Sequence, residues 1–292
     1  MRQHIQLLII DPQNDFCDLP PAHLAPNPLT GRAHAPALPV PGAHADMQRL
    51  AGLIRAGSAG LRDITVTLDS HHHLDIAHPT FWQRRDAGTL AGVAPFTPIS
   101  AQQVRDGEFQ PRDPGALPRA LAYLDALEAH GRYTLMVWPA HCEIGSWGHN
   151  IHADVRAACN EWEENHLRVV QIIGKGENPW TEHYSAVMAE VPDAQDPRTQ
   201  LNHALMARLD RADAILIAGE ASSHCVKATT EHIVAHLPGG RPQRITLLTD
   251  CMSPVTGFSA QHEAFLAAMG ERGVRLATVA QVLPQLLDNA AR

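Results

Sequence analysis

The 292-residue chain lacks the features of several classes of protein. No apolar run approaches the roughly 20 residues that a membrane-spanning helix needs. The short apolar run at residues 5–10 ends without a small-residue cleavage site, so we expect a buried strand there and not a signal. The five cysteines are odd in number, widely spaced and free of CxxC pairs. A disulfide framework and a structural zinc knuckle are therefore not expected, and a cytoplasmic location, in a reducing compartment, is the simpler prediction.

Basic and aromatic residues are also scarce. The chain has 23 Lys and Arg against 31 Asp and Glu, which gives a net charge of -8, and only 5% of its residues are aromatic. Binding to a phosphate backbone needs clustered Lys and Arg, so nucleic acid is not an expected partner. The sequence has no GxGxxG segment. A nucleotide-binding oxidoreductase on a doubly wound sheet is disfavoured for that reason.

Short apolar runs rich in β-branched residues alternate with helical patterns along the chain. This alternation predicts an α/β fold of three layers, α/β/α, doubly wound around a mostly parallel six-stranded sheet. The expected strands are 6–10, 64–68, 167–173, 214–218, 245–248 and 274–279, and the expected helices between and after them are 45–55, 153–165, 204–209, 225–235 and 260–270.

Two stretches interrupt the alternation. Residues 17–41 are crowded with proline, and residues 79–132 mix Pro, Gly and polar residues around one expected helix, 116–130. Both are expected to leave the carboxyl ends of strands, where open α/β sheets bind ligands and where long loops act as lids. We therefore predict a single domain, 1–292, with two insertions.

Two of the expected strands lead into an isolated charged residue. The first strand is followed by Asp11, and a buried carboxylate is costly unless it has a partner or a task. The alternative is that Asp11 only caps a turn. The third strand is followed by Gly174-Lys175-Gly176, where the glycines allow the backbone to approach closely and hold the lysine near a loop tip. An exposed surface lysine is the alternative here.

Carboxylate and imidazole groups gather after the second expected strand. Asp69 ends this segment and is followed by His71, His72, His73 and, further on, His78. Such groups can converge on one cation, and this mixture of ligands suits zinc, manganese or iron. Because the chain has 19 histidines, a solvated loop is the alternative.

Two further segments combine histidine with cysteine. His141 and Cys142 follow the apolar residues 135–137, and a structural role is the alternative for this pair. The strand 214–218 breaks at glycine, and a helix is expected to begin at or near Cys225. A thiol at a helix N-terminus feels the positive end of the helix dipole, which lowers its pKa, and backbone N–H groups of the same turn could receive an oxyanion. An inert buried cysteine is the alternative.

Taken in order, these five segments resemble the nicotinamidase branch of the isochorismatase-like cysteine hydrolases. The resemblance extends from the first strand to about residue 255 and excludes the two insertions. It implies the isochorismatase-like hydrolase fold. It also implies a catalytic triad of Asp11, Lys175 and Cys225, in which Asp11 accepts the thiol proton and Lys175 stabilises the charged pair.

The resemblance implies further site residues. In the family, a cis peptide precedes the nucleophile, here between Glu220 and Ala221, and orients the amides of Ala221 and Cys225 as an oxyanion hole. Phe16 and Trp138 correspond to aromatic residues that sandwich the substrate ring. The implied metal ligands are Asp69, His71 and His141, with His78 as a fourth ligand or a partner of the other three.

The activity implied by the resemblance is the hydrolysis of nicotinamide to nicotinate and ammonia through a thioester, a step of NAD salvage. It implies a divalent metal ion, zinc first, with manganese or iron as alternatives, and a homo-oligomer acting on a small amide. Ser70 stands where the family usually has Trp, and the spacing after His71 is looser, so His72, His73 and His78 compete for one role. Glu220 and His224 also stand where apolar or aromatic residues are common. The alternative is a related hydrolase of another small amide, with a pocket reshaped by the insertions.

Overall fold

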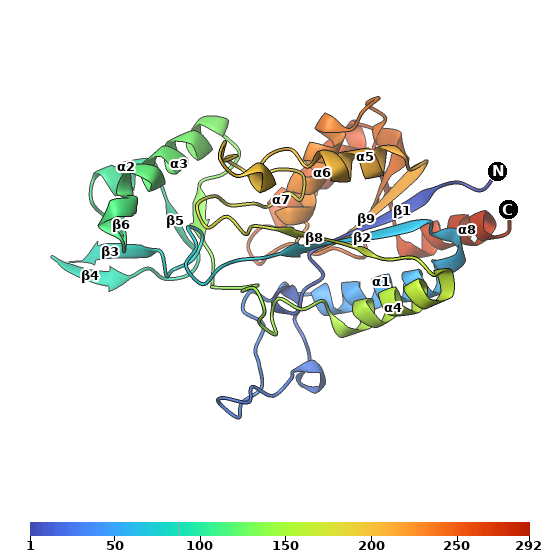
Figure 1. The fold of residues 1–292 in the computed structure, drawn as a ribbon, viewed down its shortest axis with the longest axis horizontal. Helices are drawn as coiled ribbons and strands as arrows, with labels where there is room; N and C mark the ends of the chain where they lie inside the picture. The colour runs from blue at the N-terminus through green and yellow to red at the C-terminus, as the bar shows by residue number, and fades with distance from the viewer. Residues whose placement is uncertain (87) are drawn as a thin grey trace.

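A six-stranded parallel sheet forms the centre of the structure, a computed structural model that describes residues 1–86 and 88–292 (Figure 1). The strand order is β11-β10-β9-β1-β2-β8, and every neighbouring pair is parallel. The predicted six-stranded sheet is confirmed. Its strands are β1 (Ile5–Ile10), β2 (Asp63–Asp69), β8 (Gln171–Lys175), β9 (Ala214–Gly219), β10 (Ile245–Leu248) and β11 (Arg275–Ala277).

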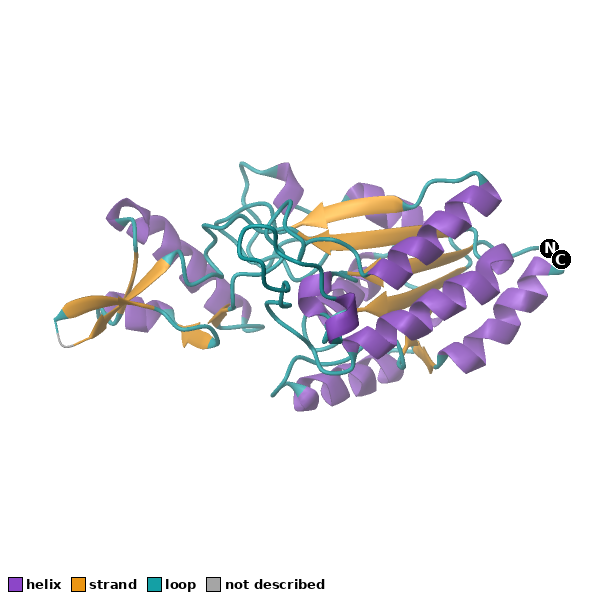
Figure 2. Ribbon diagram, turned by 90° about the horizontal axis from the view of Figure 1, so that it is seen from below, coloured by secondary structure: helices purple, strands orange, loops and turns teal. Residues whose placement is uncertain are grey.

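Helices cover both faces of this sheet, as expected for three layers. One face carries α1 (Ala43–Gly57), α4 (Ala153–His166) and α8 (Val279–Ala290), which Figure 2 shows in front of the sheet. The other face carries α5 (His203–Asp210), α6 (Cys225–His236) and α7 (Ser259–Glu271) (Figure 1). Because both faces are covered, all six residues of the central strand β1 are buried, which explains its nearly continuous apolar sequence.

Two predicted strands differ from the structure. The predicted strand 167–173 begins only at Gln171 and continues through Lys175, because Leu167 takes a left-handed conformation (φ 50°) where α4 ends. The predicted strand 274–279 ends at Ala277. The helix α8, which sequence reasoning missed, begins at Val279, where Thr278 and Gln281 form a capping box.

The first insertion is tied to the rest of the fold through Asp15. One carboxylate oxygen of Asp15 accepts the backbone N–H of Ala37 (3.0 Å), and the other accepts the backbone N–H of Cys142 (2.7 Å). Gly148 packs directly against this carboxylate, so a side chain there would collide with it. Asp15 therefore holds the end of the first insertion beside the segment that carries His141.

The second insertion builds a lobe beyond the carboxyl ends of the central strands (Figures 1 and 2). Its predicted helix is confirmed as α3 (Leu117–His130), but its strands and its second helix were missed because they are short. They are β3 (Trp82–Asp86), β4 (Thr89–Gly92) and β6 (Phe109–Pro111) in one antiparallel sheet, β5 (Thr97–Ile99), which pairs with β7 (Leu135–Val137), and α2 (Ala101–Arg105). Whether this lobe and the sheet form a single domain stays a prediction.

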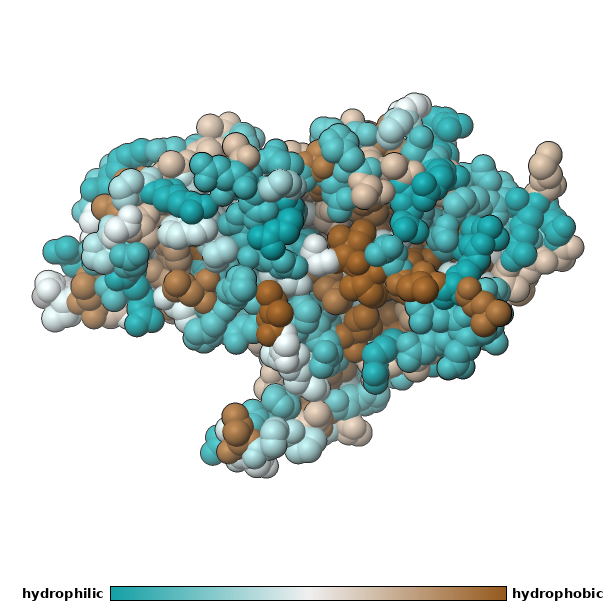
Figure 3. Space-filling model, in the orientation of Figure 1, coloured by the Kyte–Doolittle hydropathy of each residue, from teal (hydrophilic) through white to brown (hydrophobic). Residues whose placement is uncertain are grey.

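Short 3-10 turns complete the chain. They are η1 (Asn14–Phe16), η2 (Pro21–His23), η3 (Ser58–Gly60), η4 (Pro114–Ala116), η5 (Pro197–Thr199) and η6 (Pro242–Arg244). No helix within the described ranges is long and apolar enough to cross a membrane. Hydrophobic residues gather on the surface over the edge strand β8 (Figure 3), where Val169 is 84% exposed and Ile172 is 43% exposed. The predicted homo-oligomer stays a prediction.

Candidate active site

The site lies where the strand order of the sheet reverses, between β1 and β9. Ligands of open α/β sheets bind at this point, outside the carboxyl ends of the strands. Asp11 directly follows β1, and Cys225 begins α6 after β9. Gly219 has a φ of 121°, and an added Cβ there would overlap the carbonyl oxygen of Ile10. Glycine therefore allows the two strand ends to approach closely enough to share a site.

The three residues of the predicted triad meet around the ammonium group of Lys175. Its Nζ lies 2.9 Å from Oδ2 of Asp11 and 3.6 Å from Sγ of Cys225. The side chains are buried, with Asp11 0%, Lys175 3% and Cys225 6% exposed. Thr67 donates its hydroxyl to Oδ1 of Asp11 (2.5 Å), so both carboxylate oxygens of Asp11 have a close partner. The thiol, the carboxylate and the ammonium group thus share one buried cluster.

The pKa of the Cys225 thiol differs from the value expected from the sequence. Burial raises the pKa of Cys225 well above its usual value; the ammonium group of Lys175 opposes this shift, while Asp11 and Asp69 add to it. This direction is opposite to the lowering expected at a helix N-terminus, because burial and two nearby carboxylates favour the neutral thiol. Burial also raises the pKa of Asp11 against the opposing charge of Lys175. Burial alone would lower the pKa of Lys175, but Asp11 and Asp69 together raise it well above normal.

A second cluster, of three buried histidines, adjoins the triad. His71, His78 and His141 each offer a ring nitrogen, and these atoms all lie within 4.8 Å of one another. Asp69 links the two clusters: its Oδ1 lies 3.0 Å from Nζ of Lys175, and its Oδ2 lies 3.0 Å from Nε2 of His71 and 3.3 Å from Nε2 of His141. One carboxylate and three imidazoles therefore converge beside the thiol.

The outer ring nitrogens of two of these histidines are oriented by other groups. Nδ1 of His71 lies 3.1 Å from the carboxylate of Asp75, and Nδ1 of His141 lies 2.7 Å from the carbonyl oxygen of Pro139. In a neutral imidazole, an acceptor at Nδ1 favours the tautomer whose Nε2 lone pair faces the cluster. This is the arrangement that metal-binding histidines usually have. Burial alone would lower the pKa of His71, but Asp69 and Asp75 together raise it well above its usual value, so this ring has to lose a proton before it binds a metal ion.

Burial shows which of His72, His73 and His78 lies with His71 and His141 in the histidine cluster. His78 is completely buried, and neither of its ring nitrogens has a hydrogen-bond partner among the described residues. Burial lowers the pKa of His78 to about 2, with His71 and His141 adding to the shift. His72 and His73 are exposed, and Nδ1 of His73 contacts Glu143 instead (2.5 Å). His78 is thus a neutral imidazole that faces the cluster with no partner of its own.

A small pocket opens next to the thiol and encloses about 330 Å³ of unfilled space, its mouth included. The residues that line it are Phe16, Leu38, Asp69, Trp138, His141, Glu182, Tyr184, Ala221, His224, Cys225 and Val255. Both predicted aromatic residues are present. The first insertion supplies Leu38 to this lining and the second supplies none of these residues. That residues 79–132 act as a lid over the site stays a prediction.

The turn before α6 has the backbone features that the resemblance implied. The peptide bond between Glu220 and Ala221 is cis, as predicted. Within the part of the chain that the structure describes, the backbone N–H groups of Ala221 and Cys225 have no hydrogen-bond acceptor, whereas that of Ser222 donates to Ser253 (2.9 Å). Two free N–H groups therefore lie at the turn that carries the thiol.

Sequence reasoning missed Glu182 and Tyr184 of the pocket, and it named His224 only as a departure from the family pattern. Burial raises the pKa of Glu182 to about 7, and its Oε2 has no hydrogen-bond partner among the described residues. Tyr184 accepts the indole N–H of Trp138 (3.0 Å). His224 packs edge-on against Trp138, with ring centroids 5.0 Å apart. Glu182 and Tyr184 follow β8 in an irregular segment with no periodic pattern, so only their burial reveals them.

The two other departures from the family pattern lie away from the thiol. Ser70 contacts Nε2 of His149 (2.9 Å) and donates to the carbonyl oxygen of Leu68 (3.1 Å). Glu220 accepts the backbone N–H of Ser253 (3.1 Å), and burial raises its pKa well above its usual value. Neither residue lines the pocket.

The sheet, its strand order and the position of the site define the isochorismatase-like hydrolase fold, as the resemblance implied. No protein-family model matches the chain, and no curated protein matches it by sequence. Solved structures do match. The structure of yeast nicotinamidase bound to the inhibitor nicotinaldehyde is 17% identical, with 94% of this chain and 99% of that chain covered and a TM-score of 0.60.

Two further structures with this fold are similar. A nicotinamidase and pyrazinamidase of Acinetobacter baumanii is 19% identical over 95% of this chain and 97% of that one, with a TM-score of 0.57. A pyrazinamidase of Pyrococcus horikoshii in complex with zinc is 18% identical over 94% and 99%, with a TM-score of 0.53. At these low sequence identities, the structural similarity shows that this chain shares the fold of the three proteins.

Proposed function

We propose that this protein is a metal-containing cysteine amidohydrolase whose substrate is nicotinamide, which it converts with water to nicotinate and ammonia. The observation that carries the proposal is the position of Lys175, whose Nζ lies 2.9 Å from Asp11 and 3.6 Å from Cys225 in a buried cluster beside a pocket. A buried thiol with a carboxylate and an ammonium group in reach is the arrangement of an activated nucleophile.

The first half-reaction forms a thioester. Asp11 takes the proton from Sγ of Cys225, and the thiolate adds to the carboxamide carbon. The carbonyl oxygen becomes an oxyanion, which the N–H groups of Ala221 and Cys225 stabilise; each such donor contributes roughly 3 to 4 kcal/mol in hydrolases. The carbon–nitrogen bond then breaks, and Asp11 returns its proton to the departing ammonia.

The second half-reaction hydrolyses the thioester. Asp11, ionised again, takes a proton from water as the oxygen adds to the thioester carbon. The carbon–sulfur bond breaks, and the sulfur of Cys225 regains the proton from Asp11. Throughout both steps, the positive charge of Lys175 stabilises whichever of the two groups is negative. The raised pKa of Cys225 supports this scheme, because a thiol that is neutral at rest needs a base within reach.

The residues of the histidine cluster fit a divalent metal ion. The fit rests on His78, whose two ring nitrogens are buried without a hydrogen-bond partner among the described residues. A buried imidazole nitrogen without a hydrogen-bond partner destabilises the folded protein unless another group, such as a metal ion, binds to it. Asp69, His71, His78 and His141 would hold the ion, a ligand set that suits zinc, with manganese or iron as alternatives. When bound, the ion supplies a Lewis acid at the rim of the pocket.

The pocket supports a small flat substrate. Phe16 and Trp138 both line it, and an aromatic ring can stack on such side chains. The yeast nicotinamidase of similar fold was solved with nicotinaldehyde, a small pyridine compound. A second candidate keeps the chemistry but takes another small amide, because Leu38 of the first insertion and His224 also line the pocket.

The test is ammonia release by the purified protein from nicotinamide, pyrazinamide and simple aliphatic amides, with zinc, manganese or iron supplied. We expect turnover of nicotinamide and a loss of at least about 10³-fold in Cys225→Ala, because removal of a nucleophile abolishes the covalent route. Cys159→Ala, a buried cysteine in α4 on the opposite face of the sheet, is the matched control and should keep its activity.

Two outcomes would change the proposal. Turnover of another amide but not of nicotinamide would favour the second candidate. No turnover of any amide, or equal turnover in wild type and Cys225→Ala, would overturn the hydrolase. We also retain, as proposals, a cytoplasmic location in NAD salvage and assembly into a homo-oligomer; all five cysteines are free and buried, which fits a reducing compartment.

A further inference from the structure

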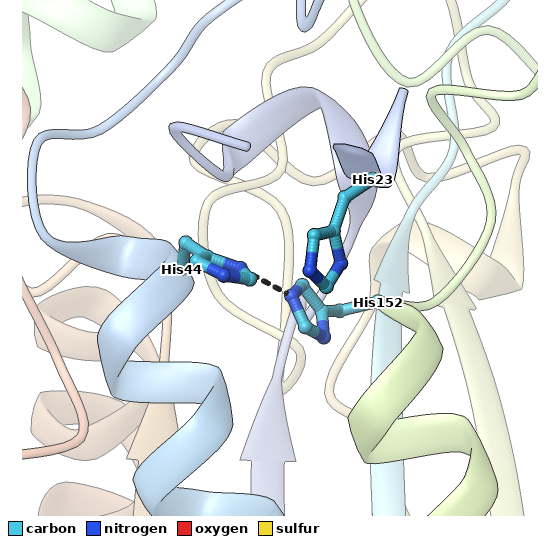
Figure 4. A group of neighbouring side chains, drawn as sticks. All are labelled: His23, His44 and His152. Carbon is cyan, nitrogen blue, oxygen red and sulfur yellow. Dashed lines mark hydrogen bonds between the residues drawn. The ribbon is translucent and has the colours of Figure 1, made fainter. Parts of the chain in front are cut away.

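Three histidines outside the candidate active site come together from separate segments of the chain. His23 ends the 3-10 turn η2 in the first insertion, His44 lies in the first turn of α1, and His152 caps the N-terminus of α4. Figure 4 shows their rings pointing toward one another. None of the three lines the pocket beside the thiol or belongs to the first histidine cluster.

Their spacing is close to that of ligands around one metal ion. One ring nitrogen from each histidine can be chosen so that all three lie within 4.8 Å of one another. Nδ1 of His44 lies 2.9 Å from Nε2 of His152. Two nitrogens bound to tetrahedral zinc at about 2.0 to 2.1 Å lie roughly 3.3 Å apart, so a few tenths of an ångström separate the present contact from a shared ion.

The rings are also in the right state of protonation for a metal. Burial lowers the pKa of His44, and the neighbouring His23 adds to the shift. Burial lowers the pKa of His152 to about 4, against the opposing charge of Asp154. Both imidazoles are therefore neutral near pH 7, so neither ring has to lose a net positive charge before a cation binds.

Carboxylates offset the positive ends of the two helices that begin at this cluster. The positive end of a helix dipole disfavours a nearby cation. Asp18 lies at the start of α1, where its carboxylate accepts the backbone N–H groups of Gly42 and His44, each at 2.8 Å. The charge of Asp154 acts on His44 as well as on His152. Two carboxylates therefore lie near the three rings.

Binding through Nε2 of His152 has one local cost. Nδ1 of this ring now accepts the backbone N–H of Asp154 at 3.2 Å, and a ring that ligates through Nε2 carries its proton on Nδ1. That long capping hydrogen bond would be lost, which weakens the cap of α4. The apparent binding energy of a structural zinc site is several times larger than the contribution of one capping hydrogen bond, so the exchange is favourable.

We propose that His23, His44 and His152 form a second divalent metal site, selective for zinc, which fastens the first insertion to the N-termini of α1 and α4. Three imidazole ligands suit zinc better than magnesium or calcium, which prefer oxygen ligands. His23 is exposed, so water can take the fourth position. The same insertion supplies Leu38 to the pocket, so the ion would also steady one wall of the candidate active site.

The test counts zinc ions on the full-length protein and needs no substrate. The protein is stripped with a chelator and titrated with zinc alone by calorimetry, as wild type, His23→Ala and His34→Ala. His34 is the matched control, because it lies in the same insertion but outside the cluster. We expect His23→Ala to lose one zinc equivalent, or to bind it at least about tenfold more weakly, and His34→Ala to match wild type.

A second measurement follows the insertion itself. The first insertion, residues 17–41, carries the proposed ligand His23. Zinc should therefore slow proteolytic cleavage of this insertion in wild type and in His34→Ala but not in His23→Ala. His23 is exposed, so its loss should leave the fold intact, which circular dichroism can check. Equal zinc stoichiometry and affinity in wild type and His23→Ala would refute the second site. That result would leave the amidohydrolase proposal untouched.

Discussion

Replacement of Lys175 by methionine should strongly destabilise the protein. The chain has only two lysines, and the Nζ of Lys175 contacts two buried carboxylates, Asp11 at 2.9 Å and Asp69 at 3.0 Å. Methionine keeps much of the side-chain volume but removes the charge, so Asp11 loses its ion-pair partner and Asp69 keeps only its contacts with histidines such as His71. Removal of one partner of a buried ion pair typically costs about 3 to 5 kcal/mol.

The loss of stability in Lys175→Met should depend on pH. In Lys175→Met, the two carboxylates repel each other, so one of them should bind a proton in the folded state far more readily than in the unfolded state. The loss of unfolding free energy in the variant should therefore be largest above neutral pH. It should become smaller as the pH falls toward 5, because the folded variant then binds a proton at one of the carboxylates. A second effect is a loss of amide hydrolysis, if the proposed function holds.

Urea unfolding at several pH values is the assay, in the presence of a chelator so that no metal ion at Asp69 compensates the lost charge. Lys227→Met is the matched control, because Lys227 lies near the ring of Tyr133 (5.3 Å), where a cation adds little. A shift of the urea midpoint at constant slope reports stability alone. If Lys175→Met lost less than about 1 kcal/mol, or no more than the control, the buried triad would not be held together by charge as we infer.

Three further predictions follow from single sites. Burial raises the pKa of Glu190 from 4.5 to about 7, so its contribution to stability should fall by on the order of 3 kcal/mol as the pH rises through that window, and Glu190→Gln should abolish this dependence in thermal or urea unfolding. Asp75→Asn should weaken zinc binding at the first histidine cluster about 10- to 100-fold in a titration, because Asp75 orients His71. Gly219→Ala should cost several kcal/mol of unfolding free energy or prevent folding, because its φ is 121° and its Cβ would overlap Ile10.

Each of these three predictions has a control variant, and a contradicting outcome can be named for the first two. Glu161→Gln, at an exposed glutamate, should leave the pH dependence unchanged, and a Glu190→Gln variant with the wild-type slope would contradict the assigned pKa. Asp125→Asn, also exposed, should keep full zinc affinity, and an unchanged affinity in Asp75→Asn would show that His71 needs no orienting partner. Gly52→Ala, in the middle of α1 with open space around it, should be tolerated or slightly stabilising.

The central sheet and the residues at its strand ends could be predicted from the sequence. Strands buried on both faces read as short continuous apolar runs, and parallel strands bring their carboxyl ends to one edge. Asp11, Asp69 and Lys175 each stand at such an end, and the structure brings their side chains together. Short strands in the second insertion could not be predicted, because three to five residues are too few to show a clear alternation.

The sequence by itself determined which residues reach the site edge, because strand length and direction are local properties. Only the tertiary structure decided which of three competing histidines, His72, His73 or His78, turns inward, since spacing along a loop does not specify distance through space. It also decided the protonation of Cys225, because burial and neighbouring charges sum over the whole surroundings. The meeting of His23 with His152 depends likewise on how distant segments pack.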